Sequence, residues 1–326
     1  MKKYKWGVIG TGKIAHTFAT ALKHNENAQL CGVASRTADK AEAFAKEFGF
    51  EKSYGSYKAF AEQSDAEIVY IATPMASHYD DAVLCLENGK NVLCEKSLTL
   101  NADQTKQLLA LAKEKGLFFM EAMWMKCRPV YRKMKEWIAS GMIGDIEYIK
   151  ADFANYIPYD PNDRLFRDDC GGGCLLDLGI YPLTLAHDLL GMPDEIISNA
   201  HMRYGVDISN SIILRYKNGA FVSADNGFEI QLSNNAVISG SKGYIILGNW
   251  FHCTCEGALY SKDGTEIEKF IRPDDINGYE YEVDEVHSCL EKGVLESSLV
   301  PHSDTVEVME IMDECRRQWG MKFPEE

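Results

Sequence analysis

A short apolar run near the start of the chain ends in a glycine-rich turn, and an amphipathic stretch follows directly. The run Tyr4–Ile9 precedes Gly10-Thr-Gly12-Lys13-Ile14-Ala15, which has the spacing G-x-G-x-x-A. In this spacing the first glycine permits a tight turn, the second lets the backbone approach a pyrophosphate, and the alanine lets helix and strand pack closely. The helix start offers N–H groups and a partial positive charge to phosphates. We therefore interpret Gly10, Gly12, Lys13 and Ile14 as part of a dinucleotide site rather than of a turn without a ligand.

Apolar runs alternate with helical patterns in the first part of the chain. The runs are apolar nearly throughout, which is typical of parallel strands covered by helices on both faces. Right-handed crossovers between such strands build a doubly wound sheet. The sequence therefore predicts a Rossmann domain over residues 1–122. The predicted strands are 4–9, 29–34, 67–72, 91–94 and 117–120, and the predicted helices are 13–24, 38–48, 56–63, 77–87 and 102–115.

The pattern changes beyond residue 122. Asn-Gly and Asp-Gly pairs between apolar runs, at 218–219 and 263–264, are strong signals of β-hairpins. We expect a second α/β domain over residues 123–326, with a large open and mainly antiparallel sheet that helices cover in part. The predicted strands are 146–153, 195–203, 211–216, 220–224, 236–240, 244–247, 258–261 and 265–270, and helices are predicted at 130–140, up to 190, at 280–291 and near the end.

The final helix carries the apolar stripe Val308, Met312, Cys315 and Trp319. Asp304 and Glu307, at the start of this helix, have the spacing of a capping pair.

Charge and cysteine content narrow the range of partners. The net charge is −15, from 34 basic and 49 acidic residues, which argues against nucleic acid or an anionic membrane as the main partner. No apolar run approaches the ~20 residues of a membrane span, and the run after Met1-Lys2-Lys3 is too short for a signal peptide. The ten cysteines lack the spacing of a zinc site. We expect reduced thiols, no metal and a cytoplasmic protein.

The end of the second predicted strand bears on the choice of cofactor. Folds that bind NAD carry an acidic residue about twenty residues beyond the glycine turn, where it holds the ribose 2′-hydroxyl. Here the chain has Ser35-Arg36. A hydroxyl and a guanidinium bind a 2′-phosphate, which a carboxylate would repel. The pair therefore favours NADP, with NAD still possible and a solvated loop arginine as the alternative.

Two further strand ends place polar residues at the sheet edge where such folds bind ligands. The third strand is followed by Thr73-Pro74 and by a helix that begins near His78, and the fourth strand ends in Glu95-Lys96. His78 is a candidate contact of the cofactor or forms local hydrogen bonds at its helix start. A charge after a buried strand is costly unless it is paired or used. Glu95 and Lys96 are therefore a structural ion pair or part of the site.

Three successive glycines precede an apolar helix in the second half. Gly171–Gly173 require a backbone that bends sharply or approaches another group closely. Asp177 and Tyr181 follow four residues apart, so they share one face if the helix has begun by then. They are candidate site residues, and an N-cap aspartate with a core tyrosine is the alternative.

Together these stretches resemble the glucose–fructose oxidoreductase / inositol dehydrogenase / MocA (Gfo/Idh/MocA) family over essentially the whole chain. The matching stretches are 6–15, 72–74, Glu95-Lys96, 121–124 and 171–181. Residues 121–128 and 171–182 look most like the branch with trans-1,2-dihydrobenzene-1,2-diol dehydrogenases and NADP-dependent D-xylose dehydrogenases. The resemblance implies homodimers or homotetramers that associate through the C-terminal sheet.

The resemblance also implies hydride transfer between a nicotinamide and a carbinol carbon of an aldose or a cyclic diol. Lys96 matches the lysine of the family's Glu-Lys-Pro motif, and Asp177 and Tyr181 match the Asp-x-Gly-x-Tyr segment. We assign Tyr181 as proton acceptor and Lys96 as the cation that makes its phenol more acidic, with the reverse assignment open. Asp177 would orient hydroxyls or the lysine. The expected cofactor contacts are Gly10, Gly12, Lys13, Ile14, Ser35, Arg36, Thr73, Pro74, His78, Glu95 and Lys96, and the candidate substrate contacts are Trp124, Arg164 and Arg167.

Two positions depart from the family pattern. Ser97 stands where the family has proline after the lysine, and Met75 stands where asparagine is common. Two other functions are alternatives: a dinucleotide-binding sugar sensor without turnover, and an NAD-dependent glycoside hydrolase. Retention of Lys96 and Tyr181 argues against the sensor, and Ser35-Arg36 argues against the hydrolase, because those members favour NAD.

Overall fold

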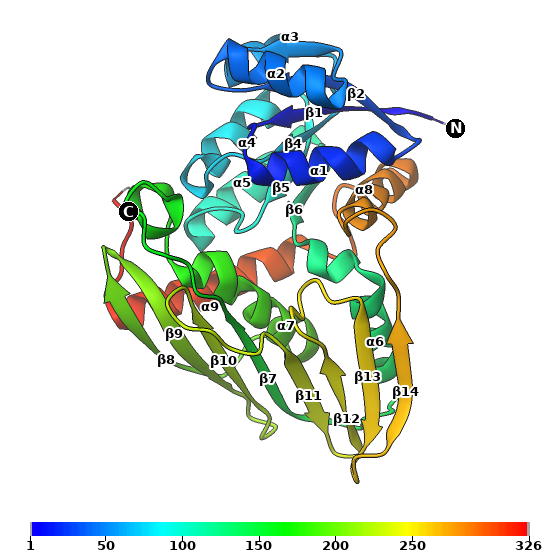
Figure 1. Cartoon of the computed structure of the whole chain (residues 1–326), viewed down its shortest axis with the longest axis vertical. Coiled ribbons are helices and arrows are strands. Elements are labelled where there is room, and N and C mark those ends of the chain that lie inside the picture. The colour runs from blue at the N-terminus through cyan, green and yellow to red at the C-terminus, as the bar shows by residue number, and fades with distance from the viewer. Residues whose placement is uncertain (1, 325–326) are drawn as a thin grey trace. The chain divides into compact units, whose positions relative to one another are not determined.

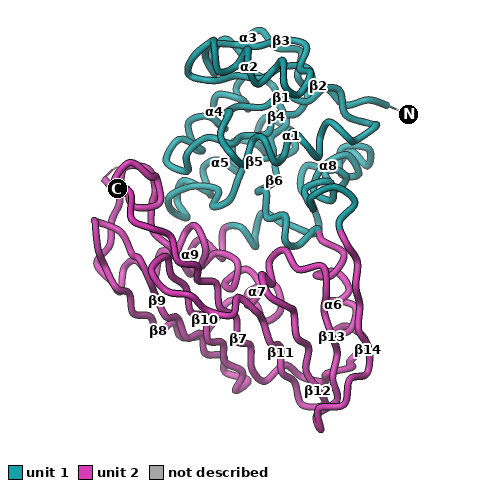
Figure 2. Tube along the Cα trace, viewed as in Figure 1, with its two compact units in different colours: residues 1–127, 274–305 teal, residues 128–273, 306–326 magenta. Residues whose placement is uncertain are grey.

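The computed structural model describes residues 2–324, which form two compact units (Figure 2). Unit 1 comprises the chain up to residue 127 together with 274–305, and unit 2 comprises 128–273 together with the chain from residue 306. This division differs from the expected pair of continuous domains that meet at residues 122 and 123. Residues 274–305 return to unit 1 because their helix α8 (Glu280–Lys292) packs against α1 (Lys13–His24).

Unit 1 contains a six-stranded sheet whose order is β3-β2-β1-β4-β5-β6 (Figure 1). All five strand pairs are parallel, and the order reverses beside β1, which confirms the predicted doubly wound fold. The one strand without a counterpart in the prediction is β3, which is only three residues long. The strands are β1 Tyr4–Ile9, β2 Ala28–Ala34, β3 Lys52–Tyr54, β4 Ile68–Ile71, β5 Asn91–Glu95 and β6 Phe119–Ala122. The other helices are α2 Ala38–Phe48, α3 Tyr57–Gln63, η1 Met75–Ser77, α4 His78–Glu87, α5 Ala102–Lys115 and η2 Trp124–Cys127.

Unit 2 contains an eight-stranded sheet whose order is β14-β13-β12-β11-β7-β10-β9-β8 (Figure 1). The sheet is antiparallel except for the pair β7 and β10, so the predicted open and mainly antiparallel sheet is confirmed. The strands are β7 Ile146–Ala154, β8 Glu195–Arg203, β9 Val206–Arg215, β10 Phe221–Gly227, β11 Ala236–Gly240, β12 Gly243–Leu247, β13 Glu256–Ser261 and β14 Glu266–Ile271. The helices are α6 Pro129–Ala139, η3 Arg164–Phe166, η4 Asp168–Cys170, η5 Leu175–Gly179 and α7 Ile180–Leu190.

The two faces of the unit 2 sheet differ in character. Side chains that point to opposite faces alternate along β9, where Ile212 and Leu214 are buried and Ile213 is 42% exposed. Helices α6 and α7 pack on this sheet. Ile197, which pairs with Ile213 across the strands, and Phe221 on β10 are also exposed. The sheet therefore presents apolar side chains on one open face.

Helix α9 (His302–Trp319) begins in unit 1 and continues in unit 2. Its predicted apolar stripe is confirmed for Val308, Met312 and Cys315, which are buried. In the part of the chain that the structure describes, no helix has the length and apolar character needed to cross a membrane.

Candidate functional site

The glycine turn of unit 1 lies between β1 and α1. Gly10 has φ +99°, and a Cβ atom there would lie 2.5 Å from the carbonyl oxygen of Ala72, so only glycine fits. A Cβ atom on Gly12 would meet nothing within 4 Å. Gly12 is the N-cap of α1 and supplies no side-chain cap to the first helical N–H groups, which belong to Lys13 and Ile14. The open space at Gly12 and the uncapped N–H groups at the start of α1 are suited to binding a pyrophosphate.

Ser35 ties the end of β2 to this turn. Its side chain is buried, and its Oγ lies 3.2 Å from Oγ1 of Thr11. Arg36 follows directly and is exposed. The structure therefore brings Ser35 to the glycine turn and leaves Arg36, the next residue, exposed.

His78 bridges two loops at the carboxyl edge of the parallel sheet. The ring is 2% exposed, with Nδ1 3.0 Å from the carbonyl oxygen of Ser97 and Nε2 2.9 Å from that of Thr73. A neutral imidazole carries one N–H, so only the doubly protonated ring donates to both carbonyls. The local hydrogen-bonding interpretation of His78 therefore holds, and a direct contact with the cofactor stays a prediction. Thr73 is fixed further because its hydroxyl donates to Asp81 at 2.7 Å.

The backbone around Lys96 is anchored on both sides. On the N-terminal side, Glu95 is buried, its carboxylate accepts from the Tyr70 hydroxyl, and it lies 3.3 Å from the backbone N–H of Lys96. The Lys96–Ser97 peptide bond is cis. On the C-terminal side, the N–H of Leu98 donates to Oε1 of Glu121 at 3.0 Å. These buried contacts place the half-buried Lys96 side chain at the end of β5.

Three of the buried polar residues near Lys96 were not predicted from sequence as site residues. Tyr70 and Glu282 are fully buried, and burial is the main reason that the pKa of each lies well above its ordinary value. Glu121 is buried at the end of β6 and also accepts from the Thr305 hydroxyl at 3.1 Å. For Glu121 the available signal was an acidic residue within the otherwise apolar run 117–124, which has to be paired or neutral when buried.

Glu121 provides a pH-dependent test of this anchor. Burial raises its pKa to about 7 from an ordinary value of 4.5. The folded state therefore keeps a proton that the unfolded state releases, so this contribution to stability is full below pH 4.5 and is lost as the pH rises through 7. We expect Glu121→Gln to remove this loss and to raise the free energy of unfolding at pH 8, relative to wild type, by up to about 3 kcal/mol.

Denaturant unfolding of both proteins from pH 5 to pH 8 measures this difference. The surface variant Glu114→Gln is the control, because Glu114 is exposed in the same unit. Parallel stability curves for wild type and Glu121→Gln would show that Glu121 keeps an ordinary pKa.

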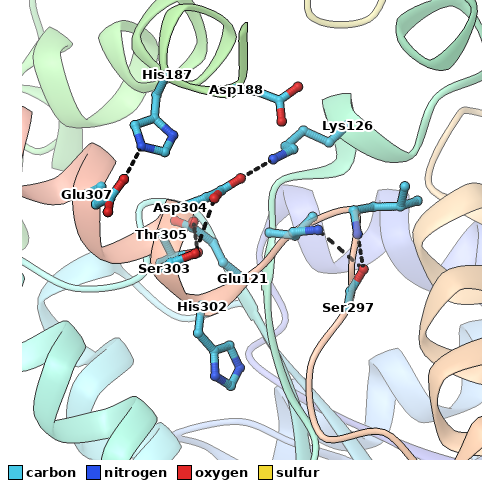
Figure 3. A network of polar contacts seen from close by, with 12 residues as sticks. Glu121, Lys126, His187, Asp188, Ser297, His302, Ser303, Asp304, Thr305 and Glu307 are labelled. Atoms are coloured by element: carbon cyan, nitrogen blue, oxygen red, sulfur yellow. Dashed lines mark hydrogen bonds and ion pairs between the residues drawn. The ribbon is translucent and has the colours of Figure 1, made fainter. Parts of the chain in front are cut away.

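The segment after β6 carries Trp124, a candidate substrate contact. Its ring stacks on Tyr279 with centroids 4.3 Å apart and an angle of 11° between planes. Nearby, Lys126 is 4% exposed and its Nζ lies 2.7 Å from Oδ2 of Asp304 (Figure 3). The capping pair predicted for α9 is therefore wrong. The helix begins at His302, which leaves Asp304 inside its first turn as the partner of Lys126, and Glu307 bonds to His187 at 2.5 Å instead.

In unit 2, each candidate arginine pairs with a carboxylate that follows it in the sequence. Nη2 of Arg164 lies 3.0 Å from Oδ1 of Asp177. Arg167 donates from Nε to Asp169 at 2.9 Å, and both partners are exposed. The structure thus joins two predicted site residues, Arg164 and Asp177, and places Arg167 in a surface ion pair.

Tyr181 follows an irregular helix start. Asp177 lies in the π-helical turn η5, where the N–H of Ile180 donates to the carbonyl of Leu175, five residues earlier. Tyr181 is 5% exposed and lies in the first turn of α7, so Asp177 and Tyr181 are not on one continuous α-helix as the four-residue spacing assumed. The wider turn changes the angular phase between them.

Aromatic side chains surround the Tyr181 ring within unit 2. Its centroid lies 4.6 Å from that of His252 and 5.6 Å from that of Phe153. Phe153 and His252 stack on each other with centroids 4.4 Å apart. His252 was not predicted, because it lies in a loop without a motif and only the fold brings it to Tyr181.

Two family models match this chain. Residues 4–123 match a model described as an oxidoreductase family with an NAD-binding Rossmann fold, and residues 131–246 match the GFO/IDH/MocA C-terminal domain. The chain is 32% identical over 329 residues to trans-1,2-dihydrobenzene-1,2-diol dehydrogenase of Xenopus tropicalis, covering 98% of this chain and 99% of the relative. It is 33% identical over 333 residues to the protein of the same name from Homo sapiens, covering 99% and 98%.

The fold is also similar to solved structures. The 3-ketoreductase KijD10 of Actinomadura kijaniata, in complex with NADP and TDP-benzene, superposes with a TM-score of 0.87 at 26% identity and covers 97% of this chain and 98% of its own. A levoglucosan dehydrogenase, in complex with NADH and levoglucosan, has a TM-score of 0.85 at 21% identity with the same coverage, and this likeness concerns the fold alone.

Proposed function

Because the chain belongs to the Gfo/Idh/MocA family of oxidoreductases, we propose that it is an NADP-preferring dehydrogenase of aldoses or cyclic diols, with Tyr181 and Lys96 as its proton-transfer pair. As a member of this family it is an NAD(P)-dependent enzyme that acts on CH–OH groups. The observation that carries the finer proposal is the anchored backbone around Lys96. The buried Glu95 accepts from the N–H of Lys96 itself, and the buried His78 and Glu121 bond to the backbone of Ser97 and Leu98, which follow it. Such support is what a functional side chain needs in order to keep its position.

The proposed chemistry divides the work between the two units. A bound nicotinamide supplies the hydride acceptor or donor. In unit 1, the uncapped start of α1 binds the phosphates and Lys96 contributes a positive charge. In unit 2, the Tyr181 hydroxyl takes the proton from the carbinol oxygen, and Asp177, held by Arg164, orients substrate hydroxyls. The reverse assignment, with Lys96 as proton acceptor, is separated from this one by the substitutions described in the Discussion.

Arg36 is proposed to bind the 2′-phosphate of NADP. We expect Arg36→Ala to raise the Kd of NADP about tenfold or more and to leave that of NAD nearly unchanged, since one charge-assisted bidentate contact contributes about 1.5–3 kcal/mol. Fluorescence titration with both dinucleotides measures this ratio. Lys40→Ala is the control, because Lys40 is an exposed cation in the following helix. An unchanged preference would remove Arg36 from this role.

The substrate class is tested by following the absorbance of reduced nicotinamide. Purified protein is supplied with NADP or NAD and a panel of aldoses, inositols and cyclic diols. Faster turnover of one aldose or diol with NADP supports the proposal. Dinucleotide binding without turnover of any member would favour the sensor, and cofactor that survives dialysis together with glycoside cleavage would favour the hydrolase.

We further propose that the chain forms homodimers or homotetramers through the unit 2 sheet. The exposed Ile197, Ile213 and Phe221 on its open face support this, because a second copy would remove these apolar side chains from water. Light scattering of the purified protein gives the mass, and a monomer would contradict the proposal.

A further inference from the structure

A buried carboxylate lies beneath the segment that leads to Tyr181. Asp207, near the start of β9, is 1% exposed. Its Oδ2 accepts from the N–H of Leu175 at 2.9 Å, from the Cys174 thiol at 3.1 Å and from Nδ2 of Asn210 at 2.9 Å. The first two donors belong to the start of the π-helical turn, so a side chain from a distant strand caps that turn.

The same carboxylate accounts for one of the three successive glycines. Gly173 has φ +111°, and a Cβ atom there would overlap with Oδ1 of Asp207. At Gly173 the close approach that the glycine run predicted is therefore an approach to Asp207, whereas Gly172 approaches the backbone carbonyls of residues 164, 165 and 167. Any larger residue at position 173 would push the carboxylate away from the N–H of Leu175.

Two buried asparagines extend this support along the turn. Nδ2 of Asn226 donates to Oδ1 of Asn210 at 2.9 Å. A Cβ atom on Gly179, the last residue of the π-helical turn, would lie 3.3 Å from Nδ2 of Asn226. The turn that carries Asp177 thus rests on polar side chains at both of its ends.

A π-helical turn is rare in proteins. We therefore expect it to depend on stabilising contacts such as those of Asp207. A negative charge at the start of a helical segment stabilises it through the helix dipole, and hydrogen bonds to a carboxylate are stronger than neutral ones. Burial raises the pKa of Asp207 to about 6, so the carboxylate is still ionised in assays above neutral pH.

We propose that Asp207 is a positioning residue that holds Asp177 and Tyr181 in place for the reaction. This inference rests on the proposed function of those two residues. Asp207 is buried under the sheet's covering segment. It would affect turnover indirectly, by fixing the π-helical turn that carries Asp177 and precedes Tyr181.

The test compares Asp207→Ala with Asp207→Asn. The alanine variant removes the acceptor of the Leu175 N–H, and we expect its kcat to fall about 100-fold, because misplacement by about 1 Å has such a cost. The Kd of NADP should change less than about threefold, since unit 1 carries the dinucleotide turn. The asparagine variant keeps an acceptor oxygen and should recover kcat to within about threefold of wild type.

Amide hydrogen exchange over residues 173–182 reports on the contact between Asp207 and the π-helical turn independently of enzyme activity. Exchange should become faster in Asp207→Ala and stay near wild type in Asp207→Asn. Gly173→Ala disturbs the contact from the other side and should reproduce the loss of kcat, which keeps the test valid if Asp207→Ala does not fold.

Two controls match these changes. Asp225→Asn alters an aspartate on the neighbouring strand β10 that bonds instead to the exposed Ser211. Gly191→Ala introduces a Cβ atom at a positive φ of 72° at the other end of α7, where nothing lies within 4 Å. Both should retain the wild-type kcat.

Faster exchange together with a lower kcat supports the inference. Unchanged exchange in Asp207→Ala overturns it at any level of activity, and so does faster exchange with a wild-type kcat. Wild-type turnover in Tyr181→Phe would instead overturn the proposed function, so the two failures are distinguishable.

Discussion

Replacing Tyr181 with phenylalanine is expected to lower kcat by about 100- to 10,000-fold, the range that a positioned acid–base group contributes. The substitution removes only the hydroxyl. The ring keeps its contacts with His252 and Phe153, so the fold of unit 2 and the affinity for NADP should stay near wild type. Steady-state turnover and NADP titration measure the two quantities separately, and the drop corresponds to about 3–5 kcal/mol of transition-state stabilisation.

Tyr244→Phe is the matched control, because Tyr244 stacks on Tyr260 within the same sheet, with centroids 4.9 Å apart, away from α7. It should leave kcat unchanged. If Tyr181→Phe turned over at a rate close to wild type, the hydroxyl would not be the proton acceptor, and Lys96 would become the first candidate.

Lys96→Met is expected to lower kcat by about 100-fold or more, because removing a preorganised charge from an active site commonly costs 100- to 1,000-fold. Methionine keeps much of the length of the side chain, so the anchored backbone between Glu95 and Leu98 should persist. Lys96→Arg should recover little, since a planar guanidinium does not replace a compact ammonium.

The control for this substitution lies at the other end of the same strand. Lys90 precedes β5, and its Nζ donates to the carbonyl of Ser64 at 2.7 Å. Lys90→Met should affect stability slightly and leave kcat unchanged. The pH profile separates the roles: if Lys96 is the cation, Lys96→Met shifts the acidic limb of kcat to higher pH, whereas loss of that limb in Lys96→Met but not in Tyr181→Phe would mean that Lys96 accepts the proton.

Much of unit 1 could be predicted from sequence because its signals are local. The helices Lys13–His24, Ala38–Phe48 and Ala102–Lys115 begin and end at the residues that the apolar period indicated. The parallel sheet followed from strands that are apolar on both faces. The short strand Lys52–Tyr54 was missed because three residues with two exposed side chains carry no such period.

The buried residues that support the candidate site could not be predicted as well from sequence. Lys96, Asp177 and Tyr181 stood out through motifs, but their supports did not. Glu121 is unusual only as an acidic residue in an apolar run, and Asp207 looks like an ordinary acidic residue. Only burial with specific donors gives either of them a role. No local pattern reports such a partner, because it lies far along the chain.

The sequence by itself determined the two sheets, the glycine turn and the positions of most helices, because periodicity and backbone sterics act over a few residues. The tertiary structure alone decided that residues 274–305 return to unit 1, that Asp177 lies in a π-helical turn before the helix of Tyr181, and that Gly173 faces a carboxylate. These outcomes depend on which distant surfaces pack together and on how each buried polar group finds its partner, and both are settled only when the whole chain is folded.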